Sequence, residues 1–324
     1  MTRLIIQIPC FNEGGTLSET LGDMPTHIDG ITSIEILVVD DGSTDETYAV
    51  AHRHGVQHIV RHTQNRGLGR AFRTGLDNAL RLGADIIVNL DADGQYRGED
   101  IARLIAPLQS GSADIVIGDR QPTRNPEFSK LKRGLQGLGS RAVFVLSGIA
   151  TPDAVSGFRA ISREAALRLN ILSKFSYTVE MIIQAASKQL RVVSIPISVN
   201  PARRPSRLFR SLPHFMSRQL ITMLRMYAMY RPMRLFFSAG VVLSVFGALP
   251  VLRFLMQYVS GDGSGHVQSL LLGGVLLTMG FVLFVAGLLS DLISQNRQIQ
   301  ELTLEKVRRL ELADRLGPST HDRH

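Results

Sequence analysis

Residues 85–95 read DIIVNLDADGQ, an apolar run of strand length that ends in two carboxylates and a glycine. Similar apolar runs precede and follow it, at residues 4–9, 34–39, 57–61 and 113–118. Helical patterns lie between the runs, at residues 16–24, 44–54, 67–82 and 98–108. Because strands that are apolar throughout are buried on both faces, this alternation predicts an α/β domain over residues 1–200, with a mainly parallel sheet between two layers of helices.

Polar residues follow these runs directly, at the edge of the sheet where parallel α/β domains bind their ligands. Asp40 and Asp41 follow the second run, Asp91 and Asp93 follow the fourth, and Arg120 follows the fifth. Mg²⁺ and Mn²⁺ prefer oxygen ligands, and Mg²⁺ often takes one or two carboxylates together with substrate phosphates. An isolated Asp-x-Asp is common in surface loops. Here the motif follows a buried strand, which predicts a site for a divalent cation, and the bound cation would in turn hold a diphosphate.

The 324 residues carry a formal net charge of +8, and this charge is local. Basic and acidic residues balance over residues 1–199 and again over 235–324, whereas residues 200–234 contain eight Arg and no Asp or Glu. The basic character therefore belongs to one segment and does not indicate a general affinity for nucleic acid. A single Cys excludes a disulfide scaffold and a zinc site built from cysteines.

Two long apolar segments follow the basic stretch, and residues 235–252 and 267–290 contain no charged side chain. A bilayer core of about 30 Å takes about 20 residues of helix, so these segments predict transmembrane helices over residues 235–256 and 267–290. The Arg-containing flanks place both outer ends in the cytoplasm and the loop 257–266 outside. A pair of buried helices in a soluble protein is the alternative interpretation.

The remaining segments are assigned from the same patterns. The first residues begin a strand at once, unlike a cleaved signal peptide, which predicts a cytoplasmic N-terminal domain. Residues 201–234 predict a basic amphipathic helix in the membrane interface, with Arg218 and Arg225 on one face. A helix packed on the N-terminal domain is the alternative. Residues 291–324 predict a charged cytoplasmic helix and tail, and the chain as a whole predicts a multi-pass protein of the inner cell membrane.

Two local features have structural interpretations. Ser43 and Glu46 form the S-x-x-E pattern of a capping box, which predicts the start of the helix 44–54. Four histidines span the end of this helix, a strand and a loop, which predicts a solvated surface rather than a site; they are His52, His54, His58 and His62.

Six motifs occur in order along the first half of the chain: IPCFNE, VVDDGSTD, NRGLGRAFRTG, LDADGQ, GDR and DAVSGFR. In this order and spacing the chain resembles the GT-A-type family 2 glycosyltransferases, and within them the branch of dolichol-phosphate mannose synthase and the bacterial polyprenyl-phosphate glycosyltransferases. The resemblance covers nearly the whole chain, because that branch can also carry two C-terminal transmembrane helices. It implies a Rossmann-like GT-A domain and a nucleotide-sugar donor that binds with Mg²⁺ or Mn²⁺.

The resemblance also implies roles for individual residues. It implies metal binding by Asp91, Asp93 and Gln95, and catalytic roles for Arg120 and Asp153. It implies Asp41 on the base of the nucleotide. Separately from the resemblance, we predict acceptor-phosphate contacts from Arg133 and from Arg218 of the basic segment. The residues implied to bind the nucleotide sugar are Pro9, Phe11, Glu13, Val39, Asp41, Asp91, Ala92, Asp93, Arg120, Arg204, Ser206 and Arg207. Family members often read GESKL where this chain reads RRPSRL from Arg203, a departure that bears on sugar or nucleotide preference.

The chemistry of the implied reaction agrees with these roles. A phosphate monoester has a second pKa of about 6 and is already largely ionised, so its attack on an anomeric carbon needs no strong base. The reaction does need a stabilised leaving diphosphate and two aligned anions, which a metal ion and Arg side chains supply. Asp153 is therefore either a positioning group or a base.

The sequence thus predicts a membrane-anchored inverting glycosyltransferase that moves a sugar from a UDP- or GDP-sugar to a polyprenyl phosphate at the cytoplasmic leaflet, for cell-envelope glycan or lipid modification. A catalytically silent membrane scaffold and a transferase with a different acceptor are the alternatives. A processive polysaccharide synthase is disfavoured, because its Q-x-x-R-W motif needs a Trp and the chain has none. The expected partners are the donor, the acceptor and the lipid bilayer, and not nucleic acid; homo-oligomerisation stays open.

Overall fold

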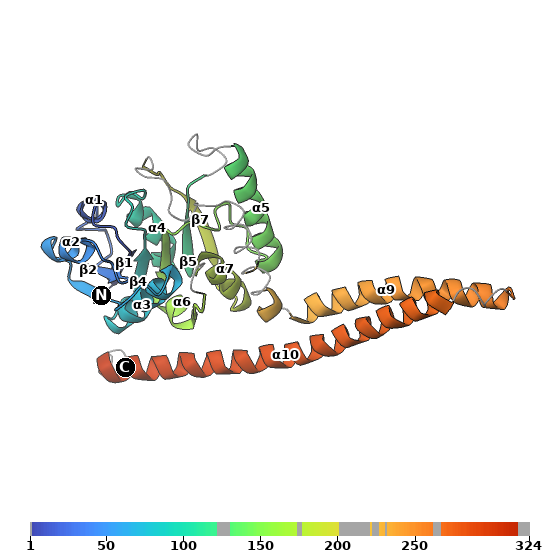
Figure 1. The fold of residues 1–324 in the computed structure, drawn as a ribbon. Coiled ribbons are helices and arrows are strands. Elements are labelled where there is room, and N and C mark those ends of the chain that lie inside the picture. Colours follow the sequence, from blue (N-terminus) through green and yellow to red (C-terminus); the bar gives the residue numbers. More distant parts are fainter. Residues whose placement is uncertain are drawn as a thin grey trace. The chain divides into compact units, whose positions relative to one another are not determined.

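The computed structural model describes residues 2–121, 130–173, 177–200, 221, 227–230, 232–261 and 267–316. For residues 130–133, 135, 136, 138, 315 and 316 it describes the backbone only. The strands are β1 (Arg3–Cys10), β2 (Ser33–Asp40), β3 (His58–Arg61), β4 (Ile86–Asn89), β5 (Ile115–Asp119), β6 (Arg159–Ser162) and β7 (Val192–Pro196). The helices are α1 (Leu17–Gly22), α2 (Thr47–Arg53), α3 (Leu68–Arg81), α4 (Asp100–Gln109), α5 (Lys130–Ser147), α6 (Arg163–Arg168), α7 (Tyr177–Ser187), α9 (Pro232–Val259) and α10 (Val267–Leu316) (Figure 1). The chain divides into two compact units, residues 1–223 with 303–324 and residues 224–302.

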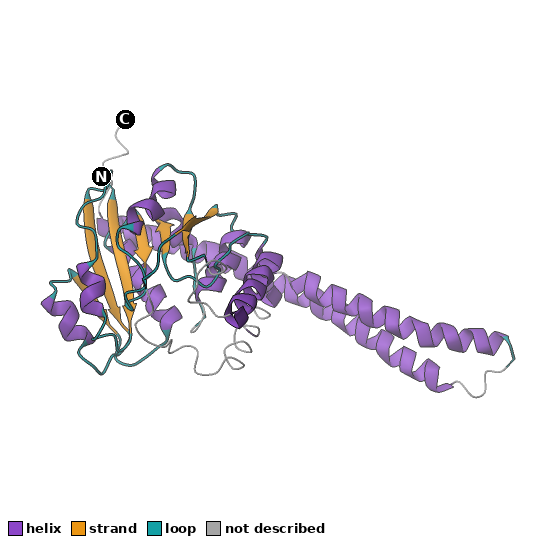
Figure 2. Ribbon diagram, turned by 90° about the horizontal axis from the view of Figure 1, so that it is seen from above, coloured by secondary structure: helices purple, strands orange, loops and turns teal. Residues whose placement is uncertain are grey.

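The strands of the first unit form one mixed sheet, drawn in orange in Figure 2. Their order in the sheet is β3-β2-β1-β4-β6-β5-β7. Strand β1 pairs in parallel with β2 and β4, β2 with β3, and β5 with β7. Strand β6 lies between β4 and β5 and is antiparallel to both. Because β6 alone among the described strands runs the other way, the carboxyl ends of β1 to β5 meet at one edge, and the chain enters β6 from that same edge.

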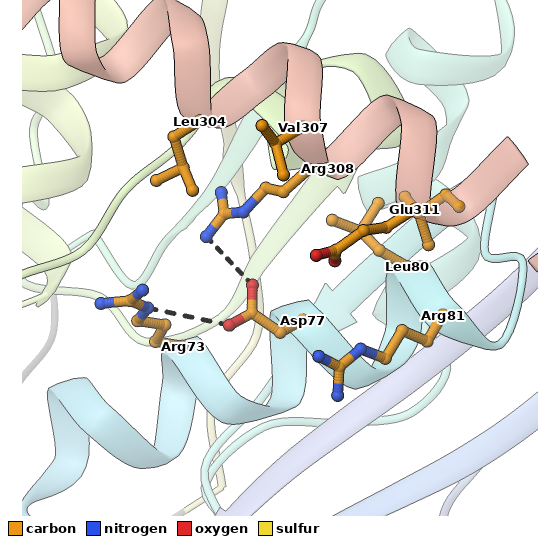
Figure 3. A pocket seen from close by; sticks show the side chains of 9 residues that line it. Arg73, Asp77, Leu80, Arg81, Leu304, Val307, Arg308 and Glu311 are labelled. Atoms are coloured by element: carbon orange, nitrogen blue, oxygen red, sulfur yellow. Dashed lines mark ion pairs between the residues drawn. The ribbon is translucent and has the colours of Figure 1, made fainter. Parts of the chain in front are cut away.

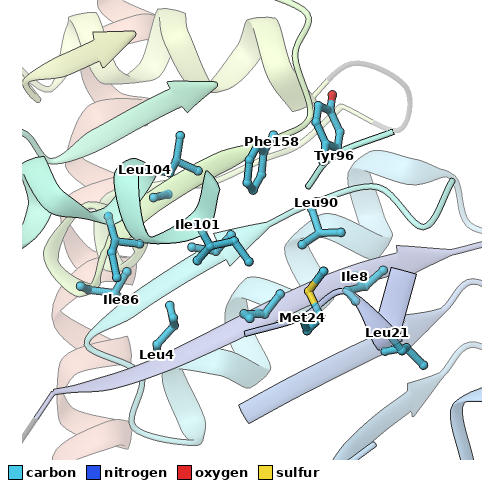
Figure 4. Packing of buried hydrophobic residues seen from close by; sticks show 14 of the residues in the cluster. Leu4, Ile8, Leu21, Met24, Ile86, Leu90, Tyr96, Ile101, Leu104 and Phe158 are labelled. Carbon is cyan, nitrogen blue, oxygen red and sulfur yellow. The ribbon is translucent and has the colours of Figure 1, made fainter. Parts of the chain in front are cut away.

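Both faces of this sheet are buried, as strands that are apolar throughout require. Leu4, Ile6 and Ile8 of β1 pack with apolar residues of α1, α2 and α4 in one core cluster, part of which appears in Figure 4. The intervening residues face α3, where a Cβ at Gly75 would lie 2.6 Å from Oε1 of Gln7. The predicted α/β fold, with a mainly parallel sheet between layers of helices, is confirmed.

The predicted strands and helices of the first 120 residues coincide with β1 to β5 and α1 to α4 to within a few residues. Two details differ. The sequence patterns do not predict the short strands β6 and β7. The capping box is also wrong, because α2 begins at Thr47 and the hydroxyl of Ser43 accepts the N–H of Asn12 at 2.9 Å. The N-cap of α2 is Glu46, which makes no side-chain cap hydrogen bond, and the neighbouring Asp45 accepts the N–H of Thr47 at 3.0 Å.

The second unit contains α9 and the first part of α10, which pack through small residues. A Cβ at Gly240 would lie 3.0 Å from the carbonyl oxygen of Gly280, and a Cβ at Gly247 would lie 3.0 Å from that of Gly273. Small residues at such positions allow helix backbones to approach closely, as they do in membrane proteins. Both helices are long and apolar enough to cross a membrane, with mean hydropathies of 2.2 and 2.4 over their most apolar stretches.

The last part of α10, residues 303–316, belongs to the first unit and packs against α3. Arg308 forms an ion pair with Asp77 at 3.1 Å and donates to the carbonyl oxygen of Leu169 at 3.0 Å. Leu312 is buried nearby with 7% of its surface exposed. A small cavity of about 140 Å³ lies between α3 and this segment (Figure 3), and none of the predicted site residues lines it.

We expect Arg308→Ala to lower the stability of the first unit by about 1–3 kcal/mol, because it removes the charged donor of the buried carbonyl oxygen of Leu169 and leaves the Asp77 carboxylate with the longer ion pair to Arg73 at 3.7 Å. The matched control is Arg309→Ala, which removes the more exposed neighbour that pairs with Glu164 and Glu305. Exposed ion pairs contribute about 0–1 kcal/mol, so this control changes stability less. Thermal unfolding of the full chain in detergent measures both; equal shifts of Tm would contradict the docking role of Arg308.

Candidate active site

Asp91 and Asp93 lie in the turn that follows β4, on either side of the buried Ala92. The N–H of Gln95 donates to Oδ1 of Asp93 at 3.1 Å and fixes the turn. Burial, followed by the nearby charge of Asp93, raises the pKa of Asp91 to about 7, although the charge of Arg120 acts in the opposite direction. Two carboxylates that repel each other in this way favour a bound cation, which compensates both charges.

Arg120 and Asp153 form a bidentate ion pair at the same edge. Nε of Arg120 donates to Oδ2 of Asp153 at 2.6 Å, and Nη2 donates to Oδ1 at 2.9 Å. The side chain of Asp153 is 0% exposed and that of Arg120 is 16% exposed. The pair joins the end of β5 to the segment that leads into β6. Because both oxygens of Asp153 are engaged and buried, the geometry favours a positioning role for Asp153 over a role as base.

Gly157 brings the segment before β6 against Asp91. Its N–H donates to the hydroxyl of Tyr96 at 3.2 Å, and its carbonyl oxygen accepts from Nδ2 of Asn89 at 2.8 Å. Both partners are buried, so the peptide is held from either side. A Cβ at this position would lie 2.6 Å from Oδ2 and 2.8 Å from Oδ1 of Asp91, closer than real Cβ atoms approach. The glycine of the motif DAVSGFR therefore forms a cradle for the Asp91 carboxylate.

Arg159, the arginine of the same motif, is hydrogen-bonded to the backbone of this segment. Arg159 is fully buried, and its guanidinium donates to the carbonyl oxygens of Ser156, Ala154 and Thr178 at 2.9, 2.9 and 2.8 Å. Burial lowers the pKa of Arg159 to about 10, and the nearby acidic groups only partly offset this effect. The guanidinium thus fixes the backbone between Asp153 and β6, since its hydrogen bonds go to carbonyl oxygens of that segment and of α7.

The residues implied to bind the nucleoside lie at the ends of β1 and β2. Pro9 and Val39 are register partners in the parallel pair, and both are buried. Phe11 lies just beyond β1 with 39% of its surface exposed. Asp41 is 2% exposed, and its carboxylate accepts hydrogen bonds from the N–H groups of Arg66 and Gly67 at 2.9 and 2.8 Å. The structure brings these four residues together; their contacts with a nucleoside stay predictions.

The loop after β1 is tied to the loop after β2. The N–H of Glu13 donates to Oγ1 of Thr47 at 2.8 Å, and the hydroxyl of Thr16 donates to the Glu13 carboxylate at 2.9 Å. Glu13 also lies close enough to Asp91 for its charge to raise the pKa of Asp91. Glu13 therefore lies between the nucleoside residues and the paired carboxylates.

Several predicted residues lie outside the described part of the chain: Arg204, Ser206, Arg207 and Arg218, together with most of the predicted interfacial helix 201–234. Arg133 lies in α5, of which this part is described in backbone only. Gln95 is described, and its carbonyl oxygen accepts the N–H of Asn200 at 2.9 Å. Its role as a metal ligand stays a prediction.

The donor set at this edge fits a divalent cation that a nucleotide diphosphate helps to bind. Within the described residues, no group of three or more His, Cys, Asp or Glu side chains is arranged to hold a metal ion. Asp91 and Asp93 instead provide the one or two carboxylates that Mg²⁺ takes when substrate phosphates supply further ligands. The cradle at Gly157 holds the oxygens of Asp91 in a fixed place, which suits that role.

Sequence reasoning missed three buried polar residues behind this edge. His62 is 8% exposed and hydrogen-bonded to Asp41, so the predicted solvated surface is wrong for this histidine. Gln7 and Asn89 are both 0% exposed, and Nε2 of Gln7 donates to Oδ1 of Asn89 at 2.9 Å. A polar residue within an otherwise apolar run was the signal for both, inside β1 for Gln7 and at the end of β4 for Asn89.

A mixed, mostly parallel α/β sheet whose strand ends carry paired carboxylates and an Arg–Asp ion pair is typical of the GT-A fold. Residues 5–169, about half of the chain, match the model of glycosyl transferase family 2, and the chain belongs to this family. The resemblance found in the sequence motifs is thereby confirmed.

Relatives and solved structures agree with this assignment. The chain is 33% identical over 217 residues to the UDP-N-acetylglucosamine–dolichyl-phosphate N-acetylglucosaminyltransferase of Methanococcus voltae, a match covering 59% of this chain and 82% of that protein. It is 28% identical over 308 residues to glycosyltransferase AglJ of Haloferax volcanii, covering 92% and 97%. Glucosyl-3-phosphoglycerate synthase of Mycobacterium tuberculosis, solved with Mn²⁺, UDP and phosphoglyceric acid, superposes with a TM-score of 0.56 at 22% identity, covering 70% of this chain and 78% of that one.

Proposed function

We propose that the protein transfers a sugar from a UDP- or GDP-sugar to a polyprenyl phosphate, with inversion at the anomeric carbon. The observation that carries this proposal is the pair Asp91 and Asp93 beside the buried Arg120–Asp153 ion pair at one edge of the sheet. The acceptor named for the Methanococcus voltae relative, dolichyl phosphate, supports an isoprenoid phosphate. The apolar helices α9 and α10 support an acceptor that resides in a membrane.

The nucleotide-sugar donor is bound through its diphosphate and through its nucleoside. A bound Mg²⁺ or Mn²⁺ supplies positive charge to the leaving diphosphate. Asp91 and Asp93 hold the cation, with Gln95 beside them. The nucleoside lies over the ends of β1 and β2, with Asp41 at its base. Arg204, Ser206 and Arg207 bind the diphosphate in this proposal, and the charges of the two arginines add to that of the cation.

The Arg120–Asp153 pair aligns the reacting groups. Arg120 contributes a positive charge that is fixed before the substrates arrive, and such preorganised charge is more effective than charge that must reorient. Asp153 acts as a positioning residue that holds the guanidinium through two hydrogen bonds. The acceptor phosphate is already ionised near neutral pH and needs no proton removed. Arg133 and Arg218 contact that phosphate.

The enzyme works at the inner leaflet of the cell membrane, for cell-envelope glycan or lipid modification. Helices α9 and α10 cross the bilayer, and the Arg-containing flanks keep the catalytic domain and both termini in the cytoplasm. The eight Arg of residues 200–234 attract anionic headgroups and guide the acceptor phosphate. In this arrangement a lipid acceptor reaches the site without leaving its membrane.

The test is a transfer assay with the full-length protein in anionic vesicles. Labelled UDP- and GDP-sugars are offered with Mn²⁺ to polyprenyl phosphate, to a free sugar and to a protein extract. We expect labelled lipid only with polyprenyl phosphate, and its loss when a chelator is added. Preferential transfer to the sugar or to protein contradicts the proposed acceptor. If no donor is consumed in a metal-dependent way, the protein is a scaffold rather than an enzyme.

The double substitution Arg218→Gln, Arg225→Gln should raise the KM for polyprenyl phosphate about 30-fold and leave the donor KM unchanged, because each Arg near an anionic surface contributes about 1 kcal/mol. The effect should shrink at high salt, since charges beyond about 8–10 Å are screened. The control replaces Arg53 and Arg81, exposed arginines of α2 and α3, by Gln. An unchanged acceptor KM in anionic vesicles would defeat the interfacial role of this segment.

A further inference from the structure

A buried histidine contacts the residue assigned to the nucleobase. Nδ1 of His62 lies 2.6 Å from Oδ1 of Asp41, and Nε2 lies 3.0 Å from Oγ1 of Thr74 on α3. A carboxylate oxygen only accepts hydrogen bonds, so Nδ1 of His62 carries the proton and donates it to Asp41. The three side chains form a continuous chain of hydrogen bonds from α3 to the end of β2.

The register of the sheet explains why this contact forms. Asp40 of β2 is the partner of Arg61 in β3, and these two side chains form an ion pair at 3.0 Å. Successive residues point to opposite faces of a sheet, so the next pair, Asp41 and His62, lies on the face that α3 covers. The backbone N–H of His62 also donates to the carbonyl oxygen of Asp40 at 2.8 Å, which continues the pairing by one residue.

The carboxylate of Asp41 has little capacity left for a ligand. Its Oδ1 accepts from His62 and from the N–H of Arg66, and its Oδ2 accepts from the N–H of Gly67. A carboxylate offers about four acceptor positions in all, two on each oxygen. Within the part of the chain that the structure describes, three are occupied, and the one that remains is on Oδ2. With 2% of Asp41 exposed, this carboxylate meets a ligand at a single point rather than along its whole edge.

We infer that His62 is a positioning residue that fixes Asp41 with a single free acceptor and thereby makes the site selective for a pyrimidine base with one ring N–H, as in uridine and thymidine. This inference rests on the proposed function and names the donor within it. Uracil presents one N–H between two carbonyl groups and matches a single acceptor. Guanine presents two adjacent N–H donors, of which Asp41 can satisfy only one. Cytosine presents an acceptor nitrogen at the corresponding position and repels the carboxylate.

A donor or acceptor that is buried without a partner costs about 1–3 kcal/mol, so binding of UDP should exceed binding of GDP and CDP by about tenfold or more. The measurement is titration calorimetry of the full-length protein with UDP, GDP and CDP in the presence of Mn²⁺. The comparison of UDP with CDP is the sharper one, because the two ligands differ only at the edge of the base that Asp41 meets.

His62→Ala should weaken UDP binding about tenfold and reduce the preference for UDP over GDP and CDP, because Asp41 loses the donor that orients it. His62→Asn should restore the preference, since its amide N–H₂ can replace Nδ1. The matched control is His58→Ala, which removes a second histidine–carboxylate contact, with Glu35 at 2.7 Å, at the opposite end of β3. This control should leave all three affinities unchanged.

Each result decides the inference. If wild-type protein binds GDP or CDP as tightly as UDP, or if His62→Ala keeps the full preference, the inference is wrong. If the role of His62 were purely structural, His62→Ala would lower the affinities for UDP, GDP and CDP equally and leave the ratios between these affinities unchanged. Transfer to polyprenyl phosphate from a GDP-sugar alone overturns the inference and leaves the proposed function standing. Absence of both nucleotide binding and transfer overturns the two together.

Discussion

Replacement of Asp93 by Asn abolishes sugar transfer at limiting Mg²⁺ and leaves the fold intact. The substitution removes one of two charged oxygen ligands, which weakens binding of the cation and of the diphosphate that binds with it. It is isosteric, and Asp93 lies in a turn rather than in the core, so thermal unfolding should not change. The matched control is Asp85→Asn at the opposite end of β4, where the carboxylate accepts the N–H of Arg3 and contacts no predicted substrate group.

The same variant makes a prediction about pH. The pKa of Asp91 is about 7, so a cation that binds its carboxylate must displace a proton at neutral pH. Affinity of the wild-type protein for Mn²⁺ should therefore rise between pH 6 and pH 8. Asp93→Asn removes a charge that raises this pKa, so the rise should shift to lower pH while the affinity at pH 8 falls. Wild-type turnover of Asp93→Asn at limiting Mg²⁺, or a pH-independent Mn²⁺ affinity of the parent protein, would contradict the metal assignment.

Gly157→Ala should reduce transfer by about 100-fold or more, an effect as large as the loss of a catalytic group. The added methyl group would lie 2.6 Å from Oδ2 of Asp91, so either the carboxylate or the peptide must move. The peptide is held by Tyr96 and Asn89, and the displacement therefore falls on Asp91. Calorimetry should show a weaker affinity for Mn²⁺ in parallel with the loss of activity.

The control for this experiment is Gly22→Ala, at the end of α1, where an added Cβ meets nothing within 4 Å. It should leave activity and Mn²⁺ affinity at their wild-type values. Normal Mn²⁺ binding in Gly157→Ala with activity lost would place the defect in substrate alignment rather than in the cradle. Full activity in that variant would show that the cradle has no role.

The sequence predicts the part of the fold in which local pattern and burial agree. Strands β1 to β5 are apolar runs ended by polar residues, and α1 to α4 lie between them with helical periodicity, so both were predictable. Strand β6 was not, because its four residues Arg159–Ser162 begin with a charge and are held by long-range pairing with β4 and β5. The antiparallel direction of β6 depends on that pairing and has no local signature.

The candidate site divides in the same way. Motif positions identify Asp91, Asp93 and Arg120 because each directly follows a strand. The bidentate contact between Arg120 and Asp153 joins residues 33 positions apart and depends on where β6 enters the sheet. The burial of His62 depends on the β2–β3 register, since a shift of one residue would move its side chain to the other face. Spacing along the chain cannot reveal either contact.

The place of β6 in the sheet has a consequence for the order in which a newly made chain matures. Among the described strands, β5 has only β6 and β7 as neighbours, and both follow it in the sequence. While the ribosome has released no more than the first 121 residues, β1 to β4 can assemble, but Arg120 has no scaffold that holds it beside Asp91. Contacts between distant segments form late because closing long loops costs entropy. The strand ends proposed to bind the nucleoside thus form before the proposed Arg120–Asp153 part of the site, and a chain that stops early leaves β4 at an unpaired edge of the sheet.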